Sequence, residues 1–237
     1  MTPKDRKSAL AEHLKSAILT LELPPGSDLD EVALGHAFGL SRTPVREVFR
    51  DLDGLGYVEL RENRGARASS LAHTEIRDFF LSAPMVYGAV LRLASRNKTP
   101  CLLAELKEAQ GAFRAALRSG GPTARTLANN RFHAVTGAMA GNVYIAPSFQ
   151  RLLIDHARIG MTFYDPLSDR DAQDLKTASE QHDAMIAAIE TGNEAAAAAL
   201  SDEHWALSRC QIERYVMPEP LDAPLGDPEV LSAGGIT

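Results

Sequence analysis

The chain has 237 residues, of which 45% are hydrophobic, and a formal net charge of −6. This length suffices for one large domain or two modest ones, and we expect two. The acidic balance argues against indiscriminate nucleic-acid binding, which needs an excess of Lys and Arg to neutralise phosphates. The sequence contains neither an apolar run of about 20 residues for a membrane span nor a signal-peptide core in residues 1–23, so we expect no membrane association and a cytoplasmic location. Its two cysteines, far apart, favour neither a disulfide framework nor a cysteine zinc site.

The first 55 residues predict three helices. Apolar residues recur at helical spacing over residues 5–22, and "PPG" at 24–26 ends that helix. Asp30 can cap a second helix, which Gly39 terminates. Ser41 or Thr43 can cap a third helix that has a proline in its first turn. The order is helix, turn, helix.

A two-stranded wing is predicted after the third helix. The stretch "YVELRENRGARAS", residues 57–69, alternates apolar and polar residues on both sides of a tight turn at 63–65. The first domain, residues 1–70, is therefore predicted to be a winged helix-turn-helix.

Arginines are concentrated in this region, and residues 41–67 contain no lysine. Arg42, Arg46 and Arg50 share one arc of the third helix, whereas its apolar residues share another. Three arginines alone more often form a solvated face. The preceding turn and the following wing favour DNA binding instead, because the second helix of such a motif enters the major groove.

Residues 71–216 predict an all-α bundle. Breaks at 97–100, 119–122, 141–142, 164–169 and 191–193 divide this segment into six helices. The fold class is thus mainly α, with the winged domain preceding a six-helix bundle. Residues 217–237, rich in Pro, Gly and acids without periodicity, predict a mobile tail.

Four polar residues of the bundle form a candidate metal site. Asn129 and His133 lie four apart on one helix face, and His182 and His204 lie on successive helices. Facing helices of a bundle often build internal metal sites in this way. The alternative is that these histidines belong to the core, which is the default interpretation of His13, His36, His73 and His156.

The segment "LPPGSDLDEVALGHAFGLSRTPVREVFRDLDGLGYVELRENRGARAS" resembles the DNA-binding domain of the GntR family of bacterial transcription regulators. The resemblance implies that Arg50 contacts the DNA backbone and that Arg64 with Gly65 brings the wing to the minor groove, where glycine permits a close approach. The predicted DNA-binding residues are Ser41, Arg42, Thr43, Arg46, Arg50, Arg64, Gly65 and Arg67.

The pattern "NxxFH" followed by two later histidines is similar to the FCD ligand-binding domain of the FadR-like branch. This resemblance implies that Asn129, His133, His182 and His204 hold a divalent metal, with zinc expected and nickel as the alternative. Family members often have Asp in place of Asn129. They commonly carry an arginine and a glutamate at two positions that match Ala83 and Tyr87 in this chain. The alternative candidates for effector ligands are Arg77, Arg92, Arg131 and Arg158.

The combined pattern predicts a metabolite-responsive transcription regulator, a repressor, that binds a palindromic DNA operator as a homodimer. A small organic acid, most simply a carboxylate, would be the effector and would bind beside the metal. A metal-dependent hydrolase is one alternative, disfavoured because Glu180 and Glu203 are poorly placed as general bases. The other is a helical domain that serves only for dimerisation and binds no metal.

Overall fold

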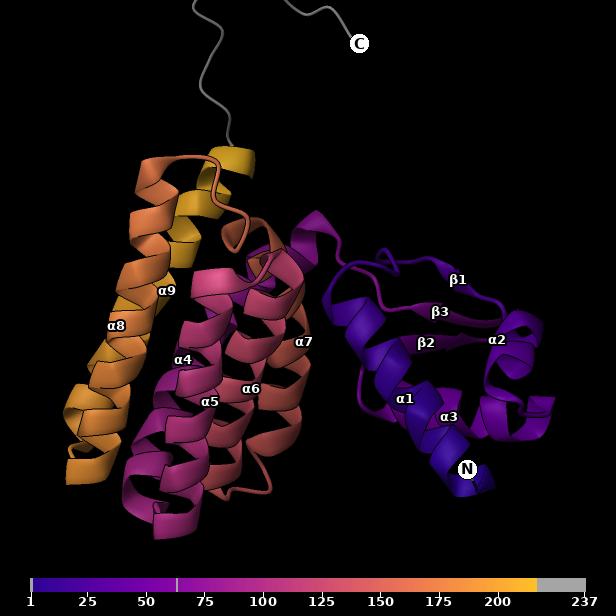
Figure 1. Ribbon diagram of the computed structural model, residues 1–237, viewed down its shortest axis with the longest axis horizontal. Helices are drawn as coiled ribbons and strands as arrows, with labels where there is room; N and C mark the ends of the chain where they lie inside the picture. Colours follow the sequence, from indigo (N-terminus) through magenta and orange to yellow (C-terminus); the bar gives the residue numbers. More distant parts are fainter. Residues whose placement is uncertain (1, 63, 217–237) are drawn as a thin grey trace, which may run out of the picture.

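The computed structural model describes residues 2–62 and 64–216, and the predicted tail at 217–237 lies outside the described residues. The winged region and the helical bundle lie side by side (Figure 1). In chain order the elements are α1 (Pro3–Leu19), β1 (Asp28–Leu29), α2 (Glu31–Phe38), α3 (Arg42–Gly54), β2 (Val58–Arg61), β3 (Gly65–Ala68), α4 (His73–Asn97), α5 (Pro100–Ser119), α6 (Pro122–Ala140), α7 (Ala146–Phe163), α8 (Asp169–Thr191) and α9 (Glu194–Val216). The mainly α fold with an N-terminal winged helix-turn-helix is confirmed.

The predicted caps of α2 are present. The side chain of Asp30 accepts hydrogen bonds from the backbone N–H groups of Val32 and Ala33, which satisfies two donors at the first turn. Gly39 follows the helix in the left-handed region, with φ 62°, a conformation that glycine adopts without steric cost. The short turn between α2 and α3 depends on these two residues.

The first helix differs from its prediction at both ends. It begins at Pro3, because Thr2 and Asp5 form a reciprocal capping box, and it ends at Leu19 rather than at residue 22. The chain reverses at Leu21, whose φ is 59°, and the N–H of Leu23 bonds back to the carbonyl of Ala17 at 2.9 Å. The "PPG" segment therefore follows the turn instead of making it.

The wing is a three-stranded antiparallel sheet rather than the predicted pair of strands. Its order is β1-β3-β2, so the short strand β1 pairs with β3 through Asp28 opposite Arg67 and Leu29 opposite Ala66. Two residues are too few for an alternating pattern to be recognised in the sequence. The pairing ties the wing to the segment that precedes α2.

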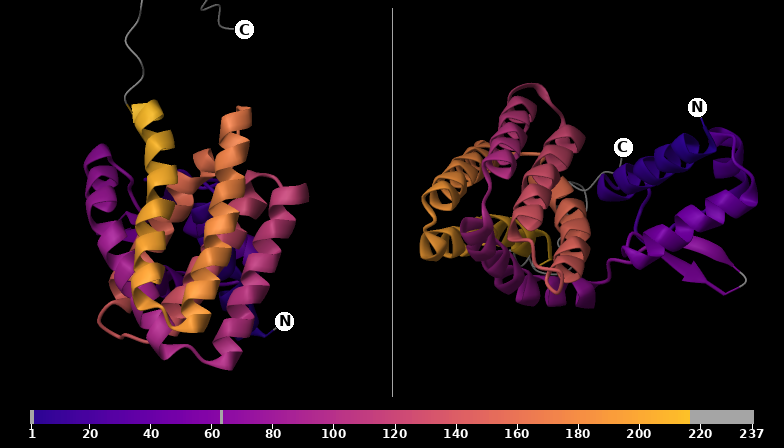
Figure 2. Two further views of the ribbon diagram at one scale, coloured as in Figure 1. Left: turned by 90° about the vertical axis from the view of Figure 1, so that its left-hand side faces the viewer. Right: turned by 90° about the horizontal axis from the view of Figure 1, so that it is seen from below.

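The bundle consists of α4 to α9, and its helix ends match the predicted breaks. Helices α8 and α9 form a hairpin (Figure 2), and α9 also packs along α4. Pro84 lies inside α4, which continues to Asn97. No helix among the described residues is both long and apolar enough to cross a membrane.

Helix α7 joins the two parts of the fold. Its residues Ile154 and Ala157 are buried in the same apolar cluster as Leu14 and Phe49 of the winged region. This shared core fixes the winged region against one side of the bundle.

Candidate functional site

The N-terminal half of α3 and the wing form the first candidate surface. Arg42, Arg46 and Arg50 are exposed, while the apolar arc of the same helix is at most 2% exposed. A hollow of about 450 Å³ lies between α3 and the wing, and Arg46, Arg50 and Gly65 are among its lining residues. Arg46 and Arg50 thus face the space that α3 and the wing enclose, whereas Arg42 lines a separate hollow beside α2.

The arginines of this surface differ in how firmly they are held. Arg46 pairs with Glu31 of α2 at 2.9 Å. The side chains of Arg42, Arg50 and Arg64 make no ion pair within residues 2–62 and 64–216. Planar guanidinium groups that remain available in this way suit forked contacts with phosphate or guanine.

Arg67 has a different environment from the other predicted DNA-binding residues. Its Nε and Nη2 atoms both donate to Glu59 Oε2, at 2.8 and 2.6 Å, across the β2–β3 pair. Gly65 turns the wing with φ 74°, and Ser41 and Thr43 are exposed at the start of α3. Arg67 therefore stabilises the pairing of β2 with β3, and the proposed DNA contacts do not include it.

The second candidate site lies inside the bundle, where α6, α8 and α9 converge. The potential ligand atoms of His133, His182 and His204 all lie within 4.8 Å of one another. The three side chains are 2%, 0% and 6% exposed, and Asn129, one turn before His133, is 1% exposed. Residues separated by 71 positions in the sequence thus meet in one buried cluster.

Two glutamines hold the imidazoles in a defined orientation. Nδ1 of His182 lies 3.1 Å from Oε1 of Gln110, and Nδ1 of His204 lies 2.9 Å from Oε1 of Gln181. A carbonyl oxygen only accepts, so each Nδ1 must carry the proton, which leaves each Nε2 as a lone-pair acceptor. The amide of Gln110 is oriented by Asp183, whose carboxylate accepts from its Nε2 at 3.1 Å.

Three of the four atoms that would bind a metal have no hydrogen-bond partner among the described residues. Nε2 of His133, Nε2 of His182 and Oδ1 of Asn129 are buried and find no hydrogen-bond donor among the described residues. Buried polar atoms are rarely left unpaired, because the loss of hydration is costly. Two of these atoms belong to the histidine cluster and the third lies one helical turn from His133, which fits a cation, since each atom can donate a lone pair to it.

The electrostatics of the cluster keep its histidines neutral. Burial, followed by the neighbouring imidazoles, holds the pKa of His133 and of His182 well below 6.5. Burial alone lowers the pKa of His204 to about 4. Neutral imidazole is the form that binds metals, so no proton needs to be displaced near neutral pH.

His156 lies beside the cluster, although its sequence context gave no reason to expect it there. Its Nδ1 is 2.9 Å from the hydroxyl of Tyr87, and its ring centroid is 4.9 Å from that of His133. Trp205 and Tyr87 pack edge to face against each other at 5.0 Å, next to the histidines. The wall of the site formed by α4, α7 and α9 is therefore aromatic.

The arginines expected to bind an effector make other contacts. Arg77 is exposed on α4, as is Arg92, and Arg131 forms an ion pair with Glu105. Arg158 is buried but donates to the segment before α4. None of these four guanidinium groups contacts the histidine cluster among the described residues. We therefore leave them out of the proposed effector site.

Arg158 connects α7 to the segment that joins the two domains. Its Nη1 donates to Ser69 Oγ at 2.8 Å, and its Nη2 donates to the carbonyls of Ser69 and Ser70 at 3.0 and 2.7 Å. Asp155 lies 3.3 Å from Arg158 and also pairs with Arg151. The side chain of Arg158 is 1% exposed, so these contacts form a buried clamp on the linker, which we call the Arg158 clamp.

Comparisons with known proteins find a matching family for each of the two parts of the chain. Residues 85–207 match the FCD domain, and residues 6–67 match the bacterial regulatory proteins of the gntR family. A probable D-xylose utilization operon transcriptional repressor from Paenarthrobacter nicotinovorans is 29% identical over 176 residues, which cover 72% of this chain and 73% of that protein. 

Solved structures share the fold. The structure of Escherichia coli McbR/YncC matches with a TM-score of 0.74 at 18% identity, over 91% of this chain and 100% of that one. A transcriptional regulator from Rhodococcus sp. RHA1, described as a putative GntR protein, matches with a TM-score of 0.66 at 20% identity, over 88% and 97% of the two chains.

Proposed function

Because this chain belongs to the GntR family of bacterial transcription regulators and carries an FCD domain, we propose that it represses transcription as an operator-bound homodimer. It is a transcription regulator and not an enzyme. Helix α3 would enter the major groove, and the wing would contact the minor groove. One winged domain covers a short half-site, so specific affinity requires two domains on a palindromic operator. The repressor assignment is supported by the named function of the Paenarthrobacter relative.

The proposed regulatory site is a divalent metal held by Asn129, His133, His182 and His204. The observation that carries this proposal is the buried cluster of acceptor atoms without partners described above. Zinc suits three neutral imidazoles and an amide oxygen, and nickel is the alternative. When bound, the ion supplies a positive charge and an open position for an oxygen ligand. The glutamines on Nδ1 would keep the imidazoles aimed at it.

The effector that fits this site best is a small monocarboxylate or hydroxy acid. Its carboxylate would complete the coordination of the ion, whose ligands here are all neutral. Ala83 and Tyr87, where resembling proteins often have an arginine and a glutamate, are 0% and 3% exposed, and Ala83 offers no partner for a second anionic group. The aromatic wall formed by Tyr87 and Trp205 suits an apolar or hydroxylated remainder.

Helix α7 offers a direct route from this site to the winged domain. His156 lies against the histidine cluster, while Arg158 on the same helix clamps the linker. If α7 can adopt two positions, an effector that binds more tightly to one of them would shift the orientation of the two winged domains in a dimer. This coupling would make DNA affinity depend on the effector.

Metal analysis of three variants tests the proposal. After dialysis, His182→Ala and His204→Ala should lose most of the bound metal that the wild type retains, because few ligands hold the ion. His156→Ala should retain it, since its Nδ1 bonds to Tyr87. Equal metal in all variants would favour the alternative in which the histidines are core residues and the bundle serves only for dimerisation.

The effector assignment has its own test. Calorimetry with lactate and with succinate should show binding of the monocarboxylate, dependent on metal, and Asn129→Asp should change its affinity by altering the charge at the ion. Equal affinity for metal-loaded and metal-stripped protein, or a preference for the dicarboxylate, would contradict this part of the proposal.

A further inference from the structure

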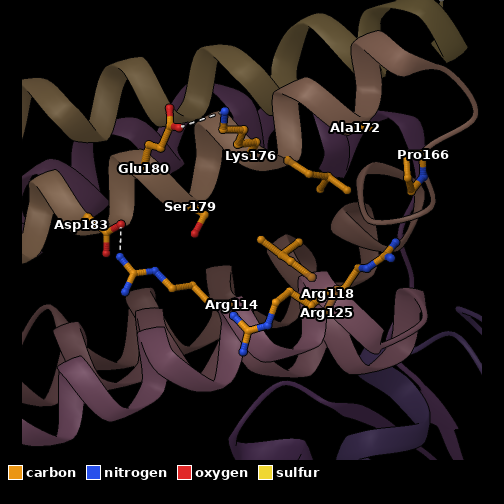
Figure 3. Close-up of a pocket in the computed structure, with 11 residues that line it drawn as sticks. Arg114, Arg118, Arg125, Pro166, Ala172, Lys176, Ser179, Glu180 and Asp183 are labelled. Carbon is orange, nitrogen blue, oxygen red and sulfur yellow. Dashed lines mark hydrogen bonds and ion pairs between the residues drawn. The ribbon is translucent and has the colours of Figure 1, made fainter.

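A second pocket lies on the bundle, outside the histidine cluster. It has a volume of about 420 Å³ and lies between α5 and α8, beside the loop that leads into α8 (Figure 3). Helix α8 is on the side of the bundle away from the winged domain (Figure 1). The basic residues that line the pocket are Arg114, Arg118, Arg125 and Lys176.

The positive charges of this pocket are only partly neutralised. Its two acidic residues are Asp183, which pairs with Arg114, and Glu180, whose carboxylate is 3.8 Å from the Lys176 ammonium. Arg118 forms no hydrogen bond or ion pair with any residue that the structure describes. The pocket therefore has an excess of positive charge.

Arg125 is oriented by hydrogen bonds to neutral groups, which do not neutralise its positive charge. Its Nη1 donates to the carbonyl of Tyr164 at 3.1 Å and its Nε to that of Ala116 at 3.5 Å, both neutral acceptors. These bonds orient the half-buried guanidinium, and its Nη2 has no hydrogen-bond partner among the residues that the structure describes. Preorganised guanidinium groups bind phosphate through parallel N–H donors more strongly than neutral donors do.

The floor of the pocket combines apolar and hydroxyl groups. Leu175 is 5% exposed and lines the floor together with Leu117. Ser179 is 8% exposed, and its side chain points into the space between the two helices in Figure 3. Its Oγ accepts from Gln110 at 3.2 Å, so its own proton remains available to a ligand.

We propose that this pocket binds the phosphate group of a small phosphorylated metabolite. Two more basic than acidic side chains line it, which matches the charge of a phosphate monoester, roughly −1.5 to −2 at pH 7. Arg118 and Arg125 would bind the phosphate oxygens, and Lys176 would add a third positive charge. Leu117 and Leu175 would pack against the organic part. The regulator would thus carry a second small-molecule site besides the one in the histidine cluster.

Inorganic phosphate is the probe that tests the charge recognition directly. Calorimetry on the full chain, stripped of metal and in a buffer without phosphate, should show saturable binding, and nitrate, a monoanion that is not a carboxylate, should bind more weakly. Arg118→Gln should weaken phosphate binding roughly tenfold, the effect of losing one charge-assisted contact. Because Arg118 is exposed, this variant should keep its fold, which circular dichroism can verify.

Two matched variants localise the effect. Lys107→Gln removes a positive charge from the same helix, at a position that pairs with Glu190 outside the pocket, and should bind phosphate like the wild type. Arg96→Gln removes one from α4, at a position that pairs with Glu194 outside the pocket, and should also leave the binding unchanged. The proposal is overturned if phosphate shows no saturable binding, if nitrate binds equally well, or if Arg118→Gln has no effect beyond that of Lys107→Gln.

Discussion

Gln110 of α5 and His182 of α8 are joined by a buried hydrogen bond of 3.1 Å between Oε1 and Nδ1. The other end of the same amide donates to the carbonyl of Ser179 at 2.9 Å and to Asp183 at 3.1 Å. The glutamine is thus fixed at both ends, and it determines which nitrogen of His182 faces the cluster. Gln110 would thus control the orientation of the metal ligand His182 without contacting the metal itself.

The first prediction follows from this relationship. Gln110→Met should lower the affinity for zinc by about 10- to 100-fold, the usual effect of losing a partner that orients a ligand. A competition titration with a chromogenic chelator measures this affinity. Gln173→Met, on the exposed face of α8, is the matched control. Unchanged zinc affinity in Gln110→Met would show that the hydrogen bond plays no part in metal binding.

Arg46 should contribute to operator recognition. We expect Arg46→Ala to weaken operator binding by roughly 1 to 3 kcal/mol, the effect of one forked base contact, without loss of fold. Fluorescence anisotropy at fixed salt, with an operator obtained by in vitro selection, measures the change. Arg67→Ala should have a smaller effect, because two hydrogen bonds to Glu59 hold its guanidinium and its side chain is 35% exposed, against 59% for Arg46. If Arg67→Ala weakened binding more than Arg46→Ala, the proposed surface would be wrong.

Arg50 should act through the phosphate backbone alone. Arg50→Ala is expected to weaken binding to all DNA sequences alike and to reduce the slope of log affinity against log salt by about 1. Titrations at several salt concentrations on operator and non-operator DNA measure both effects. A loss confined to the operator would indicate a base contact instead.

The sequence predicted the structure correctly where a feature depends on residues that are close together in the chain. The Asp30 cap, the left-handed Gly39 and the ends of the bundle helices depend on residues close together in the chain. The strand β1 was missed because only its pairing with β3 defines it.

The surroundings of the histidine cluster could be predicted only in part. The three histidines meet in the structure as the resemblance implied, but His156 was assigned to the ordinary core because the sequence does not reveal which helix faces meet. The role of Gln110, in contrast, could have been inferred from the sequence. Gln110 lies on the apolar face of α5 that includes Leu106 and Phe113, where an uncharged polar side chain needs a buried partner.

The Arg158 clamp should stabilise the orientation of the domains. Arg158→Met would leave the carbonyls of Ser69 and Ser70 without their donor, and each buried unpaired group costs about 1 to 3 kcal/mol. We expect a lower midpoint of urea unfolding and faster limited proteolysis at residues 69–72. Arg96→Met, which breaks an exposed pair with Glu194, serves as the control. Equal proteolysis of both variants would argue against a role for the clamp.

The stability of the metal-free protein should depend on pH through its buried histidines. The pKa of His204 falls from 6.5 to about 4 and that of His156 to about 3, so the unfolded chain binds more protons below pH 6.5. The free energy of unfolding should therefore fall as the pH decreases from 6.5 towards 4, by about 1.4 kcal/mol per pH unit for each such histidine. Urea titrations in the presence of a chelator measure the slope, which should be shallower in His204→Gln. A free energy of unfolding that stays constant over this range would contradict the burial of neutral imidazoles.

The central claim is that the histidine cluster holds a metal that governs DNA binding. The most direct measurement combines metal analysis of the purified protein with its operator affinity before and after metal removal. We predict about one divalent ion per chain, and a change in operator affinity of at least about fivefold when it is removed, the lower end of typical coupling between sites. His182→Ala should reproduce the affinity of the metal-stripped protein. A protein that contains no metal, or that binds its operator with the same affinity in both forms, would contradict the account.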